Sequence, residues 1–100
     1  MVLIYVVCKG RKEAEMVSMR LLKKRLIACS NMFPVKSMYW WKGKVVNEPE
    51  YAVLAKTNSK NYKKTADEIK KIHSYDVPCI LRIEAKANKE YEDWVNMEVK

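Results

Sequence analysis

Six consecutive apolar residues, Val2 to Val7, limit the fold of this chain more than any other feature of its sequence. They are rich in β-branched side chains, which favour a strand, and they are apolar at odd and even positions alike. A strand of this kind has both faces covered, because successive side chains point to opposite sides of a sheet. The run has no basic residues before it and is too short to span a membrane. We therefore predict a buried strand over residues 2–8 and expect no export or membrane segment.

Segments of helical and strand character alternate along the rest of the chain, with no internal repeat or linker. The predicted elements are helices over residues 11–26, 60–73 and 88–99, and strands over residues 35–41, 45–57 and 79–85. Two successive β-α-β units define the ferredoxin-like sandwich, an α+β fold with an antiparallel sheet in the order 4-1-3-2 and both crossover helices on one face. We predict one such domain over residues 1–100, with an extended hairpin between the second and third strands and an extra C-terminal helix.

Single residues predict how these elements begin, bend and end. Pro34 predicts a bend before the second strand, and Pro49 an interruption of the third, because proline cannot donate to a strand ladder. Gly43 supplies the tight turn of the hairpin. Asn58 is predicted to cap the second helix, and Trp94 to point inward from the last one.

The chain carries 20 Lys and Arg residues against 12 Asp and Glu residues, a formal net charge of +8. The excess is concentrated in residues 9–25 and 56–71, which include the two crossover helices. Such a balance attracts nucleic acid or other anions, but two helices with solvated lysine faces have it as well. RNA-binding modules of this fold carry a glycine-aromatic signature on the third strand, which residues 50–57 lack. We therefore favour solvated helix faces over nucleic acid binding.

The three cysteines do not form a disulfide scaffold, so we expect free thiols in a reducing cytoplasm. In the predicted topology Cys8 ends the first strand and Cys79 begins the fourth, at one edge of the sheet, whereas Cys29 lies at the opposite edge. His73, at the end of the second helix, falls in the same region as Cys8 and Cys79. Thiolate and imidazole bind copper and zinc, so these three residues are the candidate metal ligands. The alternative is that both cysteines fill small apolar spaces and that His73 serves the helix end.

An aromatic cluster, Tyr39, Trp40 and Trp41, precedes the hairpin turn. A strand places Tyr39 and Trp41 on one face and Trp40 on the other. A hairpin that projects beyond the sheet leaves part of this cluster unburied in one subunit. We therefore predict a contact with another subunit, and we favour it over base stacking.

Catalytic patterns are absent from the sequence. There is no Gly-rich phosphate loop, no Ser/His/Asp constellation and no pair of carboxylates suited to acid–base work, and the chain has 1 histidine. We therefore expect no enzymatic activity.

Four segments of the sequence resemble the CutA family of divalent-cation tolerance proteins. They are LKKRLIACSN at residues 22–31, YWWKGK at 39–44, LAKT at 54–57 and HSYDVP at 73–78. The similarity covers essentially the whole chain. It implies a ferredoxin-like fold assembled as a tight homotrimer, with an architecture similar to that of the P-II signalling proteins.

The resemblance also implies non-catalytic binding of copper or another divalent cation. In metal-binding members of the family, the cysteine that ends the first strand corresponds to Cys8 and the histidine that ends the second helix to His73. The usual His-Pro-Tyr reads His-Ser-Tyr here, and Cys79 stands after Pro78 where an acid or alanine is common. The alternatives are a P-II-like trimeric regulator, with clefts that hold a small anionic ligand near Lys56, and a ferredoxin-like RNA-binding module.

Overall fold

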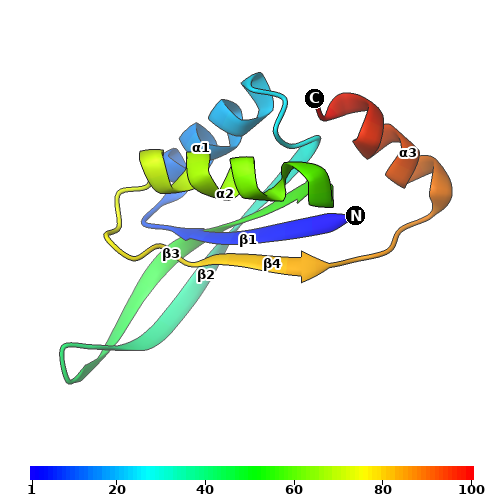
Figure 1. The fold of residues 1–100 in the computed structure, drawn as a ribbon. Helices are drawn as coiled ribbons and strands as arrows, with labels where there is room; N and C mark the ends of the chain where they lie inside the picture. The colour runs from blue at the N-terminus through cyan, green and yellow to red at the C-terminus, as the bar shows by residue number, and fades with distance from the viewer.

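The structure is a computed structural model that describes residues 1–100. Its helices and strands alternate as the sequence predicts. They are β1 (Val2–Cys8), α1 (Arg11–Lys23), β2 (Cys29–Trp41), β3 (Lys44–Thr57), α2 (Ser59–Ile72), β4 (Ile80–Glu84) and α3 (Lys89–Glu98). The strands form one antiparallel sheet in the order β2-β3-β1-β4, with α1 and α2 side by side on one face (Figure 1). The predicted ferredoxin-like topology, with its extra C-terminal helix, is confirmed.

The core lies between β1 and the two crossover helices. Val2, Ile4, Val6 and Cys8 are fully buried on the helix side of β1, whereas the alternate residues between them are only half-buried. Their partners in the core come mainly from α1, β3 and α2, and include Ala14, Val17, Leu21, Val53, Ala55 and Ile69. Within this chain one face of β1 is therefore covered completely, and the other face remains open in part.

The β2–β3 hairpin extends beyond the rest of the sheet and gives the molecule a length of 45 Å (Figure 1). At its tip Lys42 and Gly43 both have positive φ, 50° and 78°, which is the geometry of a two-residue hairpin turn. The predicted bend at Pro34 is wrong, because β2 runs without a break from Cys29. The predicted interruption at Pro49 is also wrong. A proline without an N–H is tolerated at both positions, since β2 is an edge strand and β3 pairs with β1 only from Tyr51 onward.

The ends of α1 and α2 are set by local hydrogen bonds. α1 stops at Lys23, three residues earlier than predicted, because Arg25 adopts a left-handed conformation with φ 59°. The N–H of Leu26 then donates to the Leu21 carbonyl and that of Arg25 to the Leu22 carbonyl, which together form a Schellman motif. The predicted cap of α2 is confirmed.

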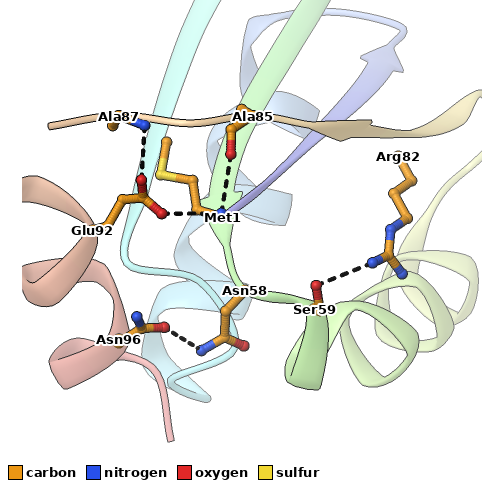
Figure 2. A network of polar contacts seen from close by, with 8 residues as sticks. All are labelled: Met1, Asn58, Ser59, Arg82, Ala85, Ala87, Glu92 and Asn96. Carbon is orange, nitrogen blue, oxygen red and sulfur yellow. Dashed lines mark hydrogen bonds and ion pairs between the residues drawn. The ribbon is translucent and has the colours of Figure 1, made fainter. Parts of the chain in front are cut away.

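A network of polar contacts holds α3 against the sheet (Figure 2). The terminal ammonium of Met1 donates to the Ala85 carbonyl at 3.1 Å and to Glu92 at 3.3 Å, and Glu92 also accepts from the Ala87 N–H. Trp94 is exposed, contrary to the prediction, since α3 buries only its Val95 side. Polar contacts and one apolar contact face are therefore enough to dock this short helix.

Candidate functional site

Three buried side chains from three different elements meet at the carboxyl end of β1. Cys8 ends β1, Glu13 lies in the first turn of α1, and His73 is the C-cap of α2. One ligand atom from each lies within 4.8 Å of the others. A thiol, a carboxylate and an imidazole together form a donor set that suits a borderline divalent ion such as Cu²⁺ or Zn²⁺.

Glu13 connects the start of α1 to the segment after α2. Its carboxylate accepts from the backbone N–H of Lys9 at 3.0 Å and from that of Ser74 at 2.9 Å. Burial by itself raises the pKa of Glu13, but these hydrogen bonds outweigh it and lower the pKa below its ordinary value. The carboxylate is therefore ionised at neutral pH.

Both ring nitrogens of His73 have hydrogen-bond partners. Nδ1 accepts from the backbone N–H of Tyr75 at 3.1 Å, so this nitrogen carries no proton. Nε2 lies 2.8 Å from the Val7 carbonyl oxygen and must donate its proton there. The imidazole is thus the neutral Nε2–H tautomer. A metal ion can bind it only after one of these two bonds is broken.

The Cys8 thiol is held in its protonated form. Burial, followed by the negative charges of Glu13 and Glu50, raises its pKa to about 12. A thiolate is the form that binds a metal, so an ion has to displace the proton of Cys8 as well as free a nitrogen of His73. The cluster has the right donors, and it must rearrange to use them.

Cys79 lies outside this cluster. The register pairs Val6 with Ile80, which places Cys79 beside Val7, whose side chain lies on the opposite face of β1 from that of Cys8. Cys79 is exposed, and Cys29 is at the far end of the sheet. The structure therefore brings together two of the three predicted ligands, Cys8 and His73.

Sequence reasoning missed Glu13, although a signal for it was present. Gly10 is the N-cap of α1, and Glu13 stands three positions after it, where a glutamate reaches back toward the backbone ahead of the helix. Here that glutamate accepts from Lys9, the residue before the cap. The same geometry turns its carboxylate toward Cys8 and His73.

A cavity of about 760 Å³, which we call the hairpin cavity, lies beside this cluster. Its walls are one side of the β2–β3 hairpin and the loop between α2 and β4. Two tyrosine–carboxylate pairs line it, because the hydroxyl of Tyr39 donates to Glu48 and that of Tyr75 donates to Glu50 at 2.5 Å. Cys8, Glu13 and His73 do not line it, so the cluster and the cavity are separate sites.

The carboxylates make the potential in the hairpin cavity negative. The hydrogen bond to Glu48 is the main reason that the pKa of Tyr39 rises to about 12. Burial and the bond to Glu50 raise the pKa of Tyr75. Partial removal of water from the Cys79 sulfur, followed by the charge of Glu50, raises the pKa of that thiol, although the residue as a whole is exposed. All three groups therefore stay protonated and neutral at neutral pH.

The aromatic cluster of the hairpin divides as the strand alternation predicts. Tyr39 and Trp41 line the hairpin cavity, whereas Trp40 does not and is 75% exposed.

Lys56, near which the P-II-like alternative expects an anion, does not line this cavity. Its Nζ lies 5.3 Å from the centre of the Tyr91 ring on α3. No helix of the structure has the length and apolar character that a membrane span requires.

Comparison with known proteins places this chain in a family. The family described as CutA1 divalent ion tolerance protein matches residues 2–98. The divalent-cation tolerance protein CutA of Archaeoglobus fulgidus is 43% identical over 94 residues, which cover 93% of this chain and 92% of the relative. The crystal structure of CutA1 from Pyrococcus horikoshii has a TM-score of 0.97 and 36% identity, and the match covers 100% of this chain and 99% of that one.

A further solved structure, described as the PII-like protein CutA from Nostoc in apo form, has a TM-score of 0.94 and 27% identity over 100% of this chain and 98% of that one. The fold and these likenesses define an α+β protein of the ferredoxin-like, PII-like type. More particularly, the chain belongs to the CutA1 family of divalent ion tolerance proteins. That family is named for tolerance of cations and not for a reaction.

Proposed function

We propose that this protein contributes to divalent-cation tolerance by binding such ions, copper among them, without catalysis and as a homotrimer. The single observation that carries the proposal is the approach of Cys8, Glu13 and His73 to within 4.8 Å in a chain of the CutA1 family. Cys8 and His73 supply the donors that copper favours, and Glu13 supplies a negative charge that offsets that of the ion. Cys79, the third ligand predicted from the sequence, lies on the other side of the sheet and is not part of this set.

Calorimetric titration with Cu²⁺ tests the site. Cys8→Ser and His73→Ala are expected to weaken binding by at least about tenfold, since each removes a donor. Cys29→Ser is the matched control, because Cys29 is a free cysteine at the other end of the sheet. Cys79→Ser is expected to leave the affinity unchanged, because Cys79 lies outside the cluster. Unchanged affinity in both Cys8→Ser and His73→Ala would reject this cluster as the site.

The open face of the sheet supports assembly into a trimer. Leu3 and Tyr5 of β1 pair with Ile83 and Leu81 of β4, and these apolar side chains lie on the face that α1 and α2 do not cover. Leu81 and Ile83 are exposed in the single chain, and the outer edges of β2 and β4 are unpaired. Contiguous apolar surface and free strand edges both favour association with further copies.

The hairpin aromatics Tyr39, Trp40 and Trp41 are the proposed contact in this assembly, and Trp40, which does not line the hairpin cavity, is expected to provide most of it. Trp40 is the most exposed of the three, so it has the most surface to bury against a neighbour. Light scattering over a range of concentrations is expected to give the mass of a trimer. Trp40→Ala is expected to weaken it, whereas Trp94→Ala, the exposed tryptophan of α3, is expected not to. A stable monomer at all concentrations would reject the homotrimer.

We place the protein in the cytoplasm, since its three cysteines are free. The structure of the Archaeoglobus fulgidus relative is described as that of a periplasmic protein, so cell fractionation is the direct test. Recovery in an oxidising compartment would overturn this assignment.

A second candidate function is that of a P-II-like regulator that binds a small molecule. The hairpin cavity favours it, because about 760 Å³ is within the range of small-molecule sites. Thermal-shift measurements with nucleotides and metabolites separate the two functions. A ligand that binds only the folded state raises the melting temperature, whether or not a metal is present.

A further inference from the structure

We propose that the hairpin cavity binds a small organic cation that carries more than one ammonium group on an aliphatic body. The site is separate from the Cys8–Glu13–His73 cluster, and it does not depend on metal binding there. Three features of the cavity favour such a ligand: its charge, the position of one buried carboxylate, and the spacing and character of its walls.

The charge of the cavity is opposite to that of the chain. Three carboxylates, those of Glu48, Glu50 and Asp76, line it against a single basic side chain, Lys36. The chain as a whole carries +8, so this is an acidic hollow in a basic protein. A concave site lined by one sign of charge concentrates ions of the other sign, which here means cations.

Glu50 is the carboxylate that is best placed to bind a ligand. Its side chain is only 7% exposed, and one of its oxygens accepts from the Tyr75 hydroxyl. The other oxygen has no partner in the protein, and no polar side-chain atom of the structure is both sealed from solvent and unpaired. That oxygen therefore opens into the cavity. A buried carboxylate with a free oxygen binds an ammonium group more strongly than a surface carboxylate does, because the local dielectric is lower.

The spacing of the carboxylates argues against a chelated metal ion. Cys8, Glu13 and His73 are the one group in the structure with three metal-ligating atoms within 4.8 Å of one another. Glu48, Glu50 and Asp76 are not close enough to form another. Charges distributed along a cavity in this way match a ligand whose own charges are separated by methylene groups.

The walls between the carboxylates are suited to an aliphatic body. Met38 and Val77 are apolar, and Trp41 presents an aromatic surface. Aromatic faces also attract ammonium groups directly. Tyr39 and Tyr75 add two more rings, and their hydroxyls hold Glu48 and Glu50 in position. The cavity thus offers both acidic and apolar surface, which complements a ligand that carries ammonium groups on an aliphatic body.

Titration of the assembled protein with spermidine, followed by calorimetry and by tryptophan fluorescence, tests this proposal. Saturable binding is expected, and Glu50→Gln is expected to raise the dissociation constant by about tenfold or more, because a charge-assisted hydrogen bond is lost. Asp76→Asn, at an exposed position of the same cavity, provides a second variant that leaves the Tyr75–Glu50 pair intact. Asp93→Asn on α3 is the matched control at a remote carboxylate and is expected to change nothing.

Two further ligands define the class. Mg²⁺ at the same concentration of positive charge is expected not to compete with spermidine, because it has no aliphatic body. Citrate, which is an anion, is expected not to bind. The absence of saturable spermidine binding would overturn the proposal. This is the result expected if a basic side chain of a second copy already fills the cavity. Equal weakening by Asp93→Asn and by the cavity variants would also overturn it, since this would show nonspecific attraction. Failure of Cu²⁺ to bind would leave this result unaffected, so the two proposals are tested separately.

Discussion

The Nε2 atom of His73 lies 2.8 Å from the carbonyl oxygen of Val7, so a hydrogen bond joins the C-cap residue of α2 to the end of β1. This bond occupies one of the two ring nitrogens through which His73 could bind a metal ion. The other ring nitrogen accepts from a backbone N–H in the following loop. The residue that the proposed metal site depends on is therefore also a structural link between a helix and the central strand.

His73→Ala is expected to lower the free energy of unfolding by about 1–3 kcal/mol, because it removes the hydrogen-bond partner of two partly buried backbone groups, the Val7 carbonyl and the Tyr75 N–H. Denaturant unfolding in the absence of metal measures this. Asp76→Asn is the control, since Asp76 is exposed in the same loop, and it is expected to stay within about 0.5 kcal/mol of the parent. A loss no larger in His73→Ala than in this control would mean that the link to Val7 contributes nothing.

Glu68 is expected to stabilise the packing of α1 against α2 in a way that depends on pH. Its buried carboxylate lies 3.1 Å from both Arg20 and Lys24, and the hydrogen bond to Lys24 leads the causes that lower its pKa. A carboxyl group with a lowered folded-state pKa adds stability above its unfolded pKa, and this stability is lost as the pH falls through the folded value.

Glu68→Gln tests that expectation. Its melting temperature is expected to lie below that of the parent at neutral pH and to converge on it as the pH falls below 4.5, the ordinary value for a glutamate. Asp67→Asn, at the exposed neighbouring position, is expected to have a smaller effect, because its Lys63 partner is largely in solvent. A difference between Glu68→Gln and the parent that stays constant down to strongly acidic pH would contradict the ion-pair interpretation.

The sequence was sufficient for the topology, because apolar runs, helical spacing and turn residues all indicate the same order of elements. It was less informative at the boundaries. Pro34 reads as a bend, yet an edge strand tolerates a proline without changing course. Arg25 ends α1 in a left-handed conformation for which glycine is the usual signal.

The candidate site could be predicted only in part, for a related reason. Topology alone brings Cys8 and His73 to one edge of the sheet. It does not decide which face a strand residue points to, because a shift of one residue in register reverses the face. Cys79 lies beside Val7 and not beside Cys8, so its thiol is on the other side of the sheet. Glu13 completes the cluster through the geometry of the start of α1, which the order of strands and helices does not reveal.

The affinity for Cu²⁺ is expected to rise with pH through the neutral range. The pKa of Cys8 is raised to about 12, so the thiol is protonated below that value and must release its proton to bind as a thiolate. One obligatory proton corresponds to about a tenfold increase in affinity for each pH unit. Titrations in buffers of different ionisation enthalpy count the protons released. Affinity that is the same at pH 6 and pH 8 would exclude the Cys8 thiolate as a ligand.

The same substitution at the two glycines of the chain is expected to have opposite effects. Gly43 has φ 78° at the hairpin tip, and a side chain there costs about 1–2 kcal/mol because the left-handed region is unfavourable for L-residues. Gly10 is the N-cap of α1 with an extended backbone, and an added Cβ would meet nothing within 4 Å. Serine is a preferred N-cap residue, so Gly10→Ser is expected to be neutral or stabilising by a few tenths of a kcal/mol. Gly43→Ser is expected to destabilise. Denaturant unfolding of the two variants side by side measures the contrast, and equal midpoints would show that the hairpin turn does not require its positive φ.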